Sequence, residues 1–303
     1  MRHRSVATAL CLVFASGGGA VGALEYPVRQ LTNDLVQEGF PCWSPDGARI
    51  VFSRTPQDPD SPLMGLWLIS PLGGEPDQLT RVIGEHPDWS PDGSLIVFDG
   101  DYGRCLQVVA AAGGEPLRLQ PPAVALTKGG KPKWSPDGHA IAFRADDTLW
   151  IYEPATGGLT AAFREEGSLP IPGCWSRDGR SLIIVLRELE SPRSAIWLIG
   201  ADGEGGLPLL AEPDAVLRSP ALSPDGKLLA FVRCEGRNCD LWVMPATGGD
   251  RSVQLTADAA SDDAPSWSPD GGTIAFASDR GGSDDIWLVE LNVPEIEAAL
   301  AAQ

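Results

Sequence analysis

The sequence predicts an all-β fold, a six-bladed β-propeller with four antiparallel strands in each blade. Six near-copies of the motif Trp-Ser-Pro-Asp-Gly begin at residues 43, 89, 134, 175, 222 and 267. The steps between them are 46, 45, 41, 47 and 45 residues, a period typical of propeller blades. A second register of Leu-Trp or Ile-Trp pairs lies downstream of the motif in five of the six repeats.

The motif marks the first two strands of each blade. Strand one ends at Trp-Ser, and Pro-Asp-Gly supplies a tight turn because Pro presets φ and Gly accepts the left-handed conformation. A β-branched or aromatic run follows, such as residues 49–52, and predicts strand two. Tryptophan that recurs at a structural period usually packs in the core. We therefore assign a structural role to Trp43, Trp89, Trp134, Trp175 and Trp267.

Two further signatures predict strands three and four. The Leu-Trp or Ile-Trp pair is expected in strand three, and the second repeat has Gln107 in place of the Trp. A segment of the Gln-Leu-Thr type is expected in strand four, usually after a Gly-Gly turn. Such segments lie at residues 78–80, 118–120, 158–160, 208–210 and 254–256.

The two ends of the chain are predicted to meet in the last blade. No Leu-Thr segment follows Trp287, whereas residues 28–32 contain one with no strands before it. If this amino-terminal strand completes the sixth blade, the ring has no open sheet edge. The expected organisation is a secretory signal peptide at 1–23, the propeller at 24–291 and a carboxy-terminal tail at 292–303.

The amino terminus and the charge suggest where the protein acts. A basic start, an apolar stretch at residues 6–14 and small residues up to Ala23 predict export, hence a periplasmic or secreted protein without membrane insertion. The formal net charge of −18 disfavours nucleic acid and anionic lipid as partners. A basic cluster at Lys128, Lys131 and Lys133 is expected to be a solvated loop.

Export also permits disulfide bonds. Cys234 and Cys239 flank the predicted hairpin between strands two and three of the fifth blade, where they can face each other and bond. Cys42 and Cys174 precede the motif in opposite blades and are not expected to pair. Five cysteines remain after the signal, so at least one stays unpaired, as a small core residue.

The repeat resembles that of the TolB family. The resemblance rests on the order Trp-Ser-Pro-Asp-Gly, Ile-Ala-Phe, Ser-Asp-Arg, Asp-Ile-Trp, Gly-Gly and Leu-Thr, and it covers about residues 25–291. It implies a propeller whose channel mouth binds protein, as that of TolB binds the peptidoglycan-associated lipoprotein. Because the resemblance is to the propeller alone, a different partner is expected. Oligogalacturonate lyases use a related propeller with a metal held by several histidines.

The sequence offers few candidates for catalysis. After the signal only His86 and His139 remain, the first near the channel mouth and the second after a Pro-Asp-Gly turn. They do not support a Ser-His-Asp triad or a His-rich metal site, so we do not expect an enzyme. Paired carboxylates stay open, because acids occur in every blade. No cofactor is expected, with Ca²⁺ among the Asp-rich loops as the alternative.

Recognition is expected on the face that carries the variable loops, because such loops on a rigid scaffold usually carry function. Several second strands end in arginine at this face, with acids opposite. One interpretation is a charged ring that binds a polar ligand, and the other is salt bridges between blades. The binding candidates are Arg54, His86, Asp101, Arg144, Arg187, Arg233, Asp262 and Arg280.

The function that these observations predict is a monomeric scaffold that binds another envelope protein. The alternative is a polysaccharide- or peptide-processing enzyme, a lyase or hydrolase, with an acidic or metal-assisted site in the propeller channel.

Overall fold

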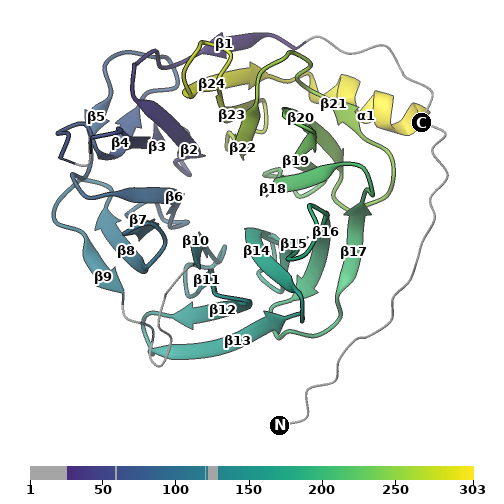
Figure 1. Ribbon diagram of the computed structural model, residues 1–303, viewed down its shortest axis with the longest axis horizontal. Coiled ribbons are helices and arrows are strands. Elements are labelled where there is room, and N and C mark those ends of the chain that lie inside the picture. The colour runs from purple at the N-terminus through teal and green to yellow at the C-terminus, as the bar shows by residue number, and fades with distance from the viewer. Residues whose placement is uncertain (1–25, 59, 120, 122–128) are drawn as a thin grey trace.

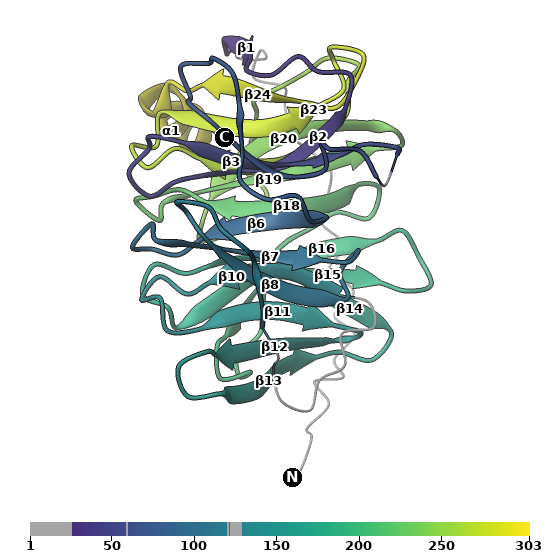
Figure 2. The same ribbon diagram turned by 90° about the vertical axis from the view of Figure 1, so that its left-hand side faces the viewer.

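The computed structural model describes residues 26–58, 60–119, 121 and 129–303, so the expected signal peptide at 1–23 lies outside the described residues. Six four-stranded antiparallel sheets are arranged as blades around a central channel (Figure 1). Figure 2 shows the same ring from its side. The predicted six-bladed propeller is confirmed.

The first three blades follow one another along the chain. Blade one consists of β2 (Gln37–Trp43), β3 (Ile50–Thr55), β4 (Gly65–Ile69) and β5 (Asp77–Gln78). Blade two consists of β6 (Gly84–Trp89), β7 (Leu95–Gly100), β8 (Cys105–Ala110) and β9 (Leu117–Leu119). Blade three consists of β10 (Gly129–Trp134), β11 (Ile141–Ala145), β12 (Thr148–Glu153) and β13 (Gly158–Arg164).

The remaining blades complete the ring. Blade four consists of β14 (Ser168–Trp175), β15 (Ser181–Glu188), β16 (Ser194–Gly200) and β17 (Leu207–Ala211). Blade five consists of β18 (Val216–Leu222), β19 (Leu228–Glu235), β20 (Asn238–Pro245) and β21 (Val253–Gln254). Blade six consists of β22 (Asp262–Trp267), β23 (Thr273–Ser278), β24 (Asp285–Glu290) and β1 (Val28–Gln30).

The amino-terminal strand closes the ring, as predicted. β1 pairs antiparallel with β24, so that Gln30 lies opposite Trp287. The Thr32 hydroxyl accepts a hydrogen bond from the Ile286 amide at 2.8 Å. In blades one and five the Thr80 and Thr256 hydroxyls accept the equivalent bond from strand three. The Leu-Thr signature is therefore a hydrogen-bonded end of strand four, and β1 supplies it to blade six.

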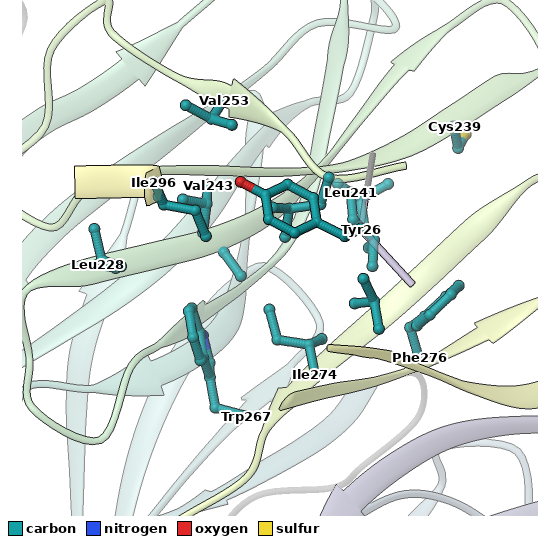
Figure 3. Packing of buried hydrophobic residues seen from close by; sticks show 14 of the residues in the cluster. Tyr26, Leu228, Cys239, Leu241, Val243, Val253, Trp267, Ile274, Phe276 and Ile296 are labelled. Carbon is teal, nitrogen blue, oxygen red and sulfur yellow. The ribbon is translucent and has the colours of Figure 1, made fainter. Parts of the chain in front are cut away.

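The core lies between neighbouring sheets. Five blades bury the aromatic residue of strand two completely, and these residues are Phe52, Phe98, Phe143, Phe231 and Phe276. The largest cluster joins blades five and six and includes Trp267 and Phe276 (Figure 3). Helix α1 (Val293–Ala302) packs Ile296 and Leu300 onto this cluster, so the tail is an ordered helix.

The Pro-Asp-Gly turns are structural, as expected. In blade one the Asp46 carboxylate accepts hydrogen bonds from the Ser44 hydroxyl at 2.6 Å and from the Ala48 amide at 3.0 Å. These bonds lower the pKa of Asp46, because they favour its charged form. The same serine–aspartate bond recurs in all six repeats.

The predicted strand four of blade three lies in β13, but its Leu-Thr signature is three residues out of register. Trp150 lies opposite Ala161, as Trp67 lies opposite Gln78 in blade one. Ala162, rather than Leu159, therefore takes the place of Leu79, and it is buried in the core. The Leu-Thr letters at 159–160 lie earlier in β13, which is longer than the other fourth strands.

Candidate functional site

The innermost strands share a bulge that shapes the channel. In five blades the residue three positions before the first residue of the motif has a positive φ and is followed by proline. These residues are Phe40, His86, Lys131, Ser219 and Ala264, with φ between 47° and 54°. Blade four has Pro172 at this position, whose ring fixes φ at a negative value. Such left-handed residues are costly outside glycine and cluster at functional sites.

The bulge residues form one ring of side chains in the channel, which we call the bulge ring. They line a cavity of about 340 Å³ together with the residues just before the motif. The bulge ring consists of Phe40, His86, Lys131, Pro172, Ser219 and Ala264. The next layer consists of Cys42, Asp88, Lys133, Cys174, Ala221 and Ser266. The bulge ring thus presents six residue types at one structural position, and the next layer presents five.

The motif tryptophans also line this cavity and join adjacent blades. The indole N–H of Trp89 donates to the Cys42 carbonyl at 3.2 Å, and that of Trp175 donates to the Lys133 carbonyl at 3.0 Å. Trp267 makes the same bond to Ala221 at 3.0 Å. Three of the five motif tryptophans therefore link blades through a hydrogen bond, whereas the indole nitrogens of Trp43 and Trp134 are buried with no such partner among the described residues.

Blade two contributes a cluster of ligand-type side chains. His86 Nδ1 lies 3.2 and 3.1 Å from the two carboxylate oxygens of Asp99. Glu85 completes a group whose ligand atoms all lie within 4.8 Å of one another. The ring of His86 packs on Phe40 of blade one at 3.9 Å between centroids. The Lys131 amide of blade three donates to Asp99 at 3.0 Å, so three blades hold the cluster.

Burial dominates the electrostatics of this cluster. It lowers the pKa of His86, although the Asp99 carboxylate opposes the effect, so the imidazole is neutral near pH 7. Burial and the Asp99 charge raise the pKa of Glu85. Burial lowers the pKa of Lys131, while Asp263 and Asp99 favour its charged form.

The basic cluster is not the solvated loop that we expected. Lys131 and Lys133 lie on β10 and line the channel, whereas Lys128 lies outside the described residues. The Lys133 ammonium is 3.0 Å from Asp88. Burial alone would lower the pKa of Lys133, but Asp88 outweighs it and raises the pKa. Both cationic side chains reach the channel from the bulge of β10, where Lys131 has φ 54°.

Three of the strand-two arginines are bound in ion pairs. Arg54 is 4% exposed, donates to Glu38 at 2.7 Å and pairs with Asp34. Its guanidinium lies over the Trp67 ring at 4.2 Å. Arg233 lies over Trp242 and pairs with Glu212 at 2.7 Å and with Glu235. These arginines are therefore not free charges at the mouth.

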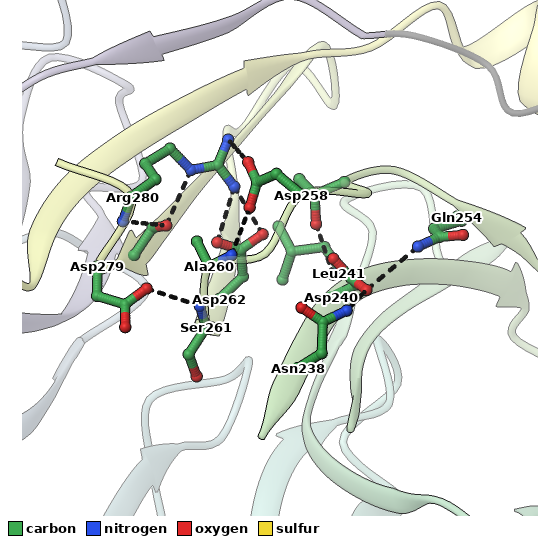
Figure 4. Close-up of polar contacts among 12 residues, drawn as sticks. Asn238, Asp240, Leu241, Gln254, Asp258, Ala260, Ser261, Asp262, Asp279 and Arg280 are labelled. Carbon is green, nitrogen blue, oxygen red and sulfur yellow. Dashed lines mark hydrogen bonds and ion pairs between the residues drawn. The ribbon is translucent and has the colours of Figure 1, made fainter. Parts of the chain in front are cut away.

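Arg280 repeats the arrangement of Arg54 in blade six (Figure 4). Its NH2 group donates to both oxygens of Asp262 at 2.8 Å, and NH1 lies 3.1 Å from Asp258. It also lies over the Trp287 ring at 5.3 Å. We expected salt bridges between blades. Instead, each of these two arginines pairs with acids in the first strand of its own blade and in the segment that leads into that strand.

The same four kinds of residue meet on each side of blade six, where it contacts the neighbouring blade. We call each of these two groups a polar joint. The first joins blades six and one through Thr32, Asp34, Glu38 and Arg54. The second joins blades five and six through Thr256, Asp258, Asp262 and Arg280. In both, the threonine of the preceding blade hydrogen-bonds the strand-one acid and lowers its pKa, against burial, which raises it. Burial is the larger effect on Glu38, whose pKa rises to about 7.

The other binding candidates are more exposed. Arg187 and Asp101 are exposed on the loop face. Arg144 is half-buried and donates to the Asp146 carbonyl at 2.7 Å. Burial lowers its pKa, and its Nε is buried with no partner among the described residues. The candidates are thus not one ring, because only His86 belongs to the bulge ring while Arg54, Asp262 and Arg280 belong to the polar joints.

The cysteines follow the predicted pattern. Cys234 and Cys239 form a disulfide across the β19–β20 hairpin. Cys42, Cys105 and Cys174 are free. Burial raises the pKa of Cys42 to about 11 and that of Cys174 to about 12, so both channel thiols stay protonated.

Sequence reasoning missed Phe40 and Lys131 as channel residues, and it missed the cluster that Glu85 and Asp99 form with His86. A signal was available, because a proline stands two positions before the motif in five repeats. The residue before that proline differs in every repeat, which is unusual in an otherwise uniform strand. Asp99 lacked any such signal, because it became relevant only through its pairing with Glu85.

The comparisons with known proteins agree with this architecture. Residues 167–300 match the family model described as the TolB beta propeller domain, so the TolB-like repeat is confirmed there. TolB from Acinetobacter baumannii superposes with a TM-score of 0.62 and 19% identity over 80% of this chain. That match covers 57% of the TolB chain, so this chain matches little more than half of its length.

Two other solved structures show how widely the fold is used. An oligogalacturonate lyase in complex with manganese has a TM-score of 0.57 and 20% identity, over 88% of this chain and 93% of the lyase. The β-propeller domain of Cps50 (Swd1) from Myceliophteria thermophila has a TM-score of 0.60 and 11% identity, over 88% of this chain and 100% of that domain. Identities this low show the fold alone. No curated protein matches.

The described part of the chain has no helix with the length and apolar character that crossing a bilayer requires.

Proposed function

Because the chain is a TolB-like propeller, we propose that it is an exported scaffold whose channel mouth binds a segment of another envelope protein. The observation that supports this most is the bulge ring. Six copies of one structural position carry an aromatic ring, an imidazole, an ammonium group, a proline, a hydroxyl and a methyl group. A purely structural position would repeat, as the Pro-Asp-Gly turns on the opposite face do.

The mouth offers mixed chemistry to a partner. Phe40 supplies an apolar surface, Lys131 a cation, and Asp263 an acid that accepts a bond from Ser219 at 2.7 Å. A flexible polar segment with both apolar and charged side chains fits such a ring better than a uniformly charged polymer does. The periplasmic or secreted location, and binding as a monomer, are part of this proposal.

The test is affinity capture from an envelope extract, with the mature propeller as bait and mass spectrometry of the retained proteins. We expect a reproducible partner that is lost when Phe40→Ala and Lys131→Glu are combined. The matched control combines His139→Ala and Arg180→Ala, two exposed residues on the turn face. Equal retention by both double variants would place binding elsewhere, and retention of nothing would contradict the scaffold role.

A second candidate function is that of a lyase or hydrolase acting on a polysaccharide or peptide. The observation in its favour is that Glu85, His86 and Asp99 lie together, with His86 at the cavity wall. Incubation with oligogalacturonates and with peptides, followed by chromatography of the products, tests it. Turnover that persists in a Glu85→Gln, His86→Gln double variant would exclude this cluster as the site.

A further inference from the structure

Blade two departs from the repeat at one point of the channel wall. Consecutive residues in a regular strand point to opposite faces of a sheet, so Glu85 and His86 would ordinarily diverge. The bulge between Glu85 and Asp88, with His86 at φ 50°, brings both side chains to the same place. Asp99 reaches the same place from the neighbouring strand, because it pairs with Glu85.

Other blades have the bulge without these ligands. The corresponding pairs are Gly39 and Phe40, Gly130 and Lys131, Arg218 and Ser219, and Asp263 and Ala264. Their strand-two partners are Ser53, Arg144, Val232 and Ala277. Only blade two, among the described residues, places three potential metal ligands within 4.8 Å of one another.

From this geometry we propose that Glu85, His86 and Asp99 bind a divalent transition-metal ion of the Zn²⁺ or Mn²⁺ type. One imidazole nitrogen and two carboxylates form a mixed donor set that suits these ions, whereas Ca²⁺ takes oxygen ligands alone. This metal site is independent of the proposed scaffold role, because it needs no partner protein.

The distances fit a shared ion. His86 Nδ1 lies 3.1–3.2 Å from the Asp99 oxygens, a separation that two ligands of one ion also have when each lies about 2.1 Å from it. The neutral ring donates its Nδ1 proton to Asp99. On binding, Nδ1 loses this proton to solvent and Nε2 takes one up, so the ring stays neutral and the Nδ1 lone pair becomes the ligand.

The surroundings orient the ligands. Asp99 is 2% exposed and receives the Lys131 amide, while Phe40 fixes the plane of the imidazole. Such contacts to the ligands commonly tune metal affinity. A divalent ion also compensates two nearby carboxylates whose mutual repulsion contributes to the raised pKa of Glu85.

The test is isothermal titration of the chelator-treated mature protein with Zn²⁺, Mn²⁺ and Ca²⁺. We expect one Zn²⁺ or Mn²⁺ per chain, and a loss of at least about tenfold in affinity in His86→Gln and in Asp99→Asn. The matched controls are His139→Gln and Asp101→Asn, an exposed histidine and an exposed acid outside the cluster. Glu85→Gln provides a third ligand variant should either of the first two fail to fold.

Substitution with Co²⁺ separates this site from the channel thiols. Bound Co²⁺ should show d–d absorption without the charge-transfer band of a thiolate ligand. A thiolate band that disappears in Cys42→Ser would place the ion at the cysteine layer and overturn the proposal. Unchanged affinity in all three ligand variants, or tighter binding of Ca²⁺ than of Zn²⁺ and Mn²⁺, would overturn it as well.

Discussion

Blade six and blade two differ in the residues that they place at the loop face of the ring. Beside blade six, each polar joint places an arginine between a tryptophan ring and two acids, as Arg54 and Arg280 show. Blade two has Gly100 where blade one has Arg54, and Gln107 where blade one has Trp67. Its strand one has Gly84 in the place of Glu38, and a β-carbon there would lie 2.6 Å from the Phe98 ring.

The difference follows from the covalent chain. Blades one to five are each completed by consecutive strands, whereas blade six is completed by β1 from the opposite end. The β1–β24 pairing closes the ring without a peptide bond, and the polar joints hold blade six to the blade on each side. Among the described residues, blade two lacks such a joint, and the positions next to Gly84 and Gly100 carry Glu85, His86 and Asp99. The comparison predicts large losses of stability near blade six and small or opposite effects in blade two.

Removal of residues 25–32 should have the largest effect. It deletes β1 and the Thr32 hydroxyl, and leaves β24 as an open edge. Because domains are stable by only about 5–15 kcal/mol, we expect the truncated chain to be largely unfolded or aggregated. Circular dichroism during heating is the measurement. Removal of residues 302–303 is the control, and a truncated protein that melts like the full-length protein would refute the closure.

Substitution of Arg54 by Met should have the next largest effect. The change leaves Glu38 buried without its partner and removes the stacking on Trp67, so the free energy of unfolding should fall by about 3 kcal/mol. Urea unfolding measures it. Arg104→Met is the control, because Arg104 is 62% exposed and its loss should change stability by less than about 0.5 kcal/mol. Equal losses in both variants would remove the distinction between the two regions.

The stability of the protein should depend on pH through Asp240, which lies near the acids of the second polar joint. Burial, with the charges of Asp262 and Asp258, raises the pKa of Asp240 to about 6 from 3.8. Between these values the folded state keeps a proton that the unfolded state has lost, so this group makes stability fall as pH rises from about 4 to 6.

Asp240→Asn should therefore raise the free energy of unfolding more at pH 7 than at pH 4, and the difference should be about 1–2 kcal/mol. The amide retains the hydrogen-bonding capacity that Asn238 and Gln254 use, since each donates to Asp240 Oδ2. Urea unfolding at both pH values measures the difference. A variant whose pH profile parallels that of the wild type would show that folding leaves the pKa of Asp240 at its ordinary value.

The smallest effect is expected in blade two. The pKa of Glu85 is raised by burial and by Asp99, so ionised Glu85 costs stability at neutral pH and Glu85→Gln should raise the free energy of unfolding by up to about 1 kcal/mol. The measurement is urea unfolding in the presence of a chelator. A clear loss of stability instead would make Glu85 a structural residue like Glu38, and blade two would no longer differ from blade one.

The sequence predicted the fold because the fold depends on local and periodic features. Turn residues such as Asp46 make bonds within a few residues, and the strand order follows from the repeat. Even the closure by residues 28–32 could be read from a missing strand at one end and a surplus strand at the other. The error at residues 158–160 arose because a two-residue signature recurs by chance within a longer strand.

The site was less predictable because it depends on contacts between blades. Arg54 and Arg144 both lie near the end of a second strand and look alike in the sequence. Arg54, however, is buried and donates to Glu38, whereas Arg144 donates to the carbonyl of Asp146 in a loop. Lys131 looked like part of a polar loop, because its place in the bulge of β10 depends on how that strand pairs with β11. No spacing in the sequence relates Phe40 to His86, although the two rings are in contact.

The pairing of β1 with β24 also determines when the molecule can become native. Val28 lies opposite Val289, so this contact must wait until almost every residue between them is available. Contacts that connect such distant residues are slow to form and cost the most loop-closure entropy. A chain that ended before β24 would keep its first strand unpaired. The ring can therefore close only in a chain of full length. We expect a chain interrupted before its last blade to stay incompletely folded and to be cleaved by proteases.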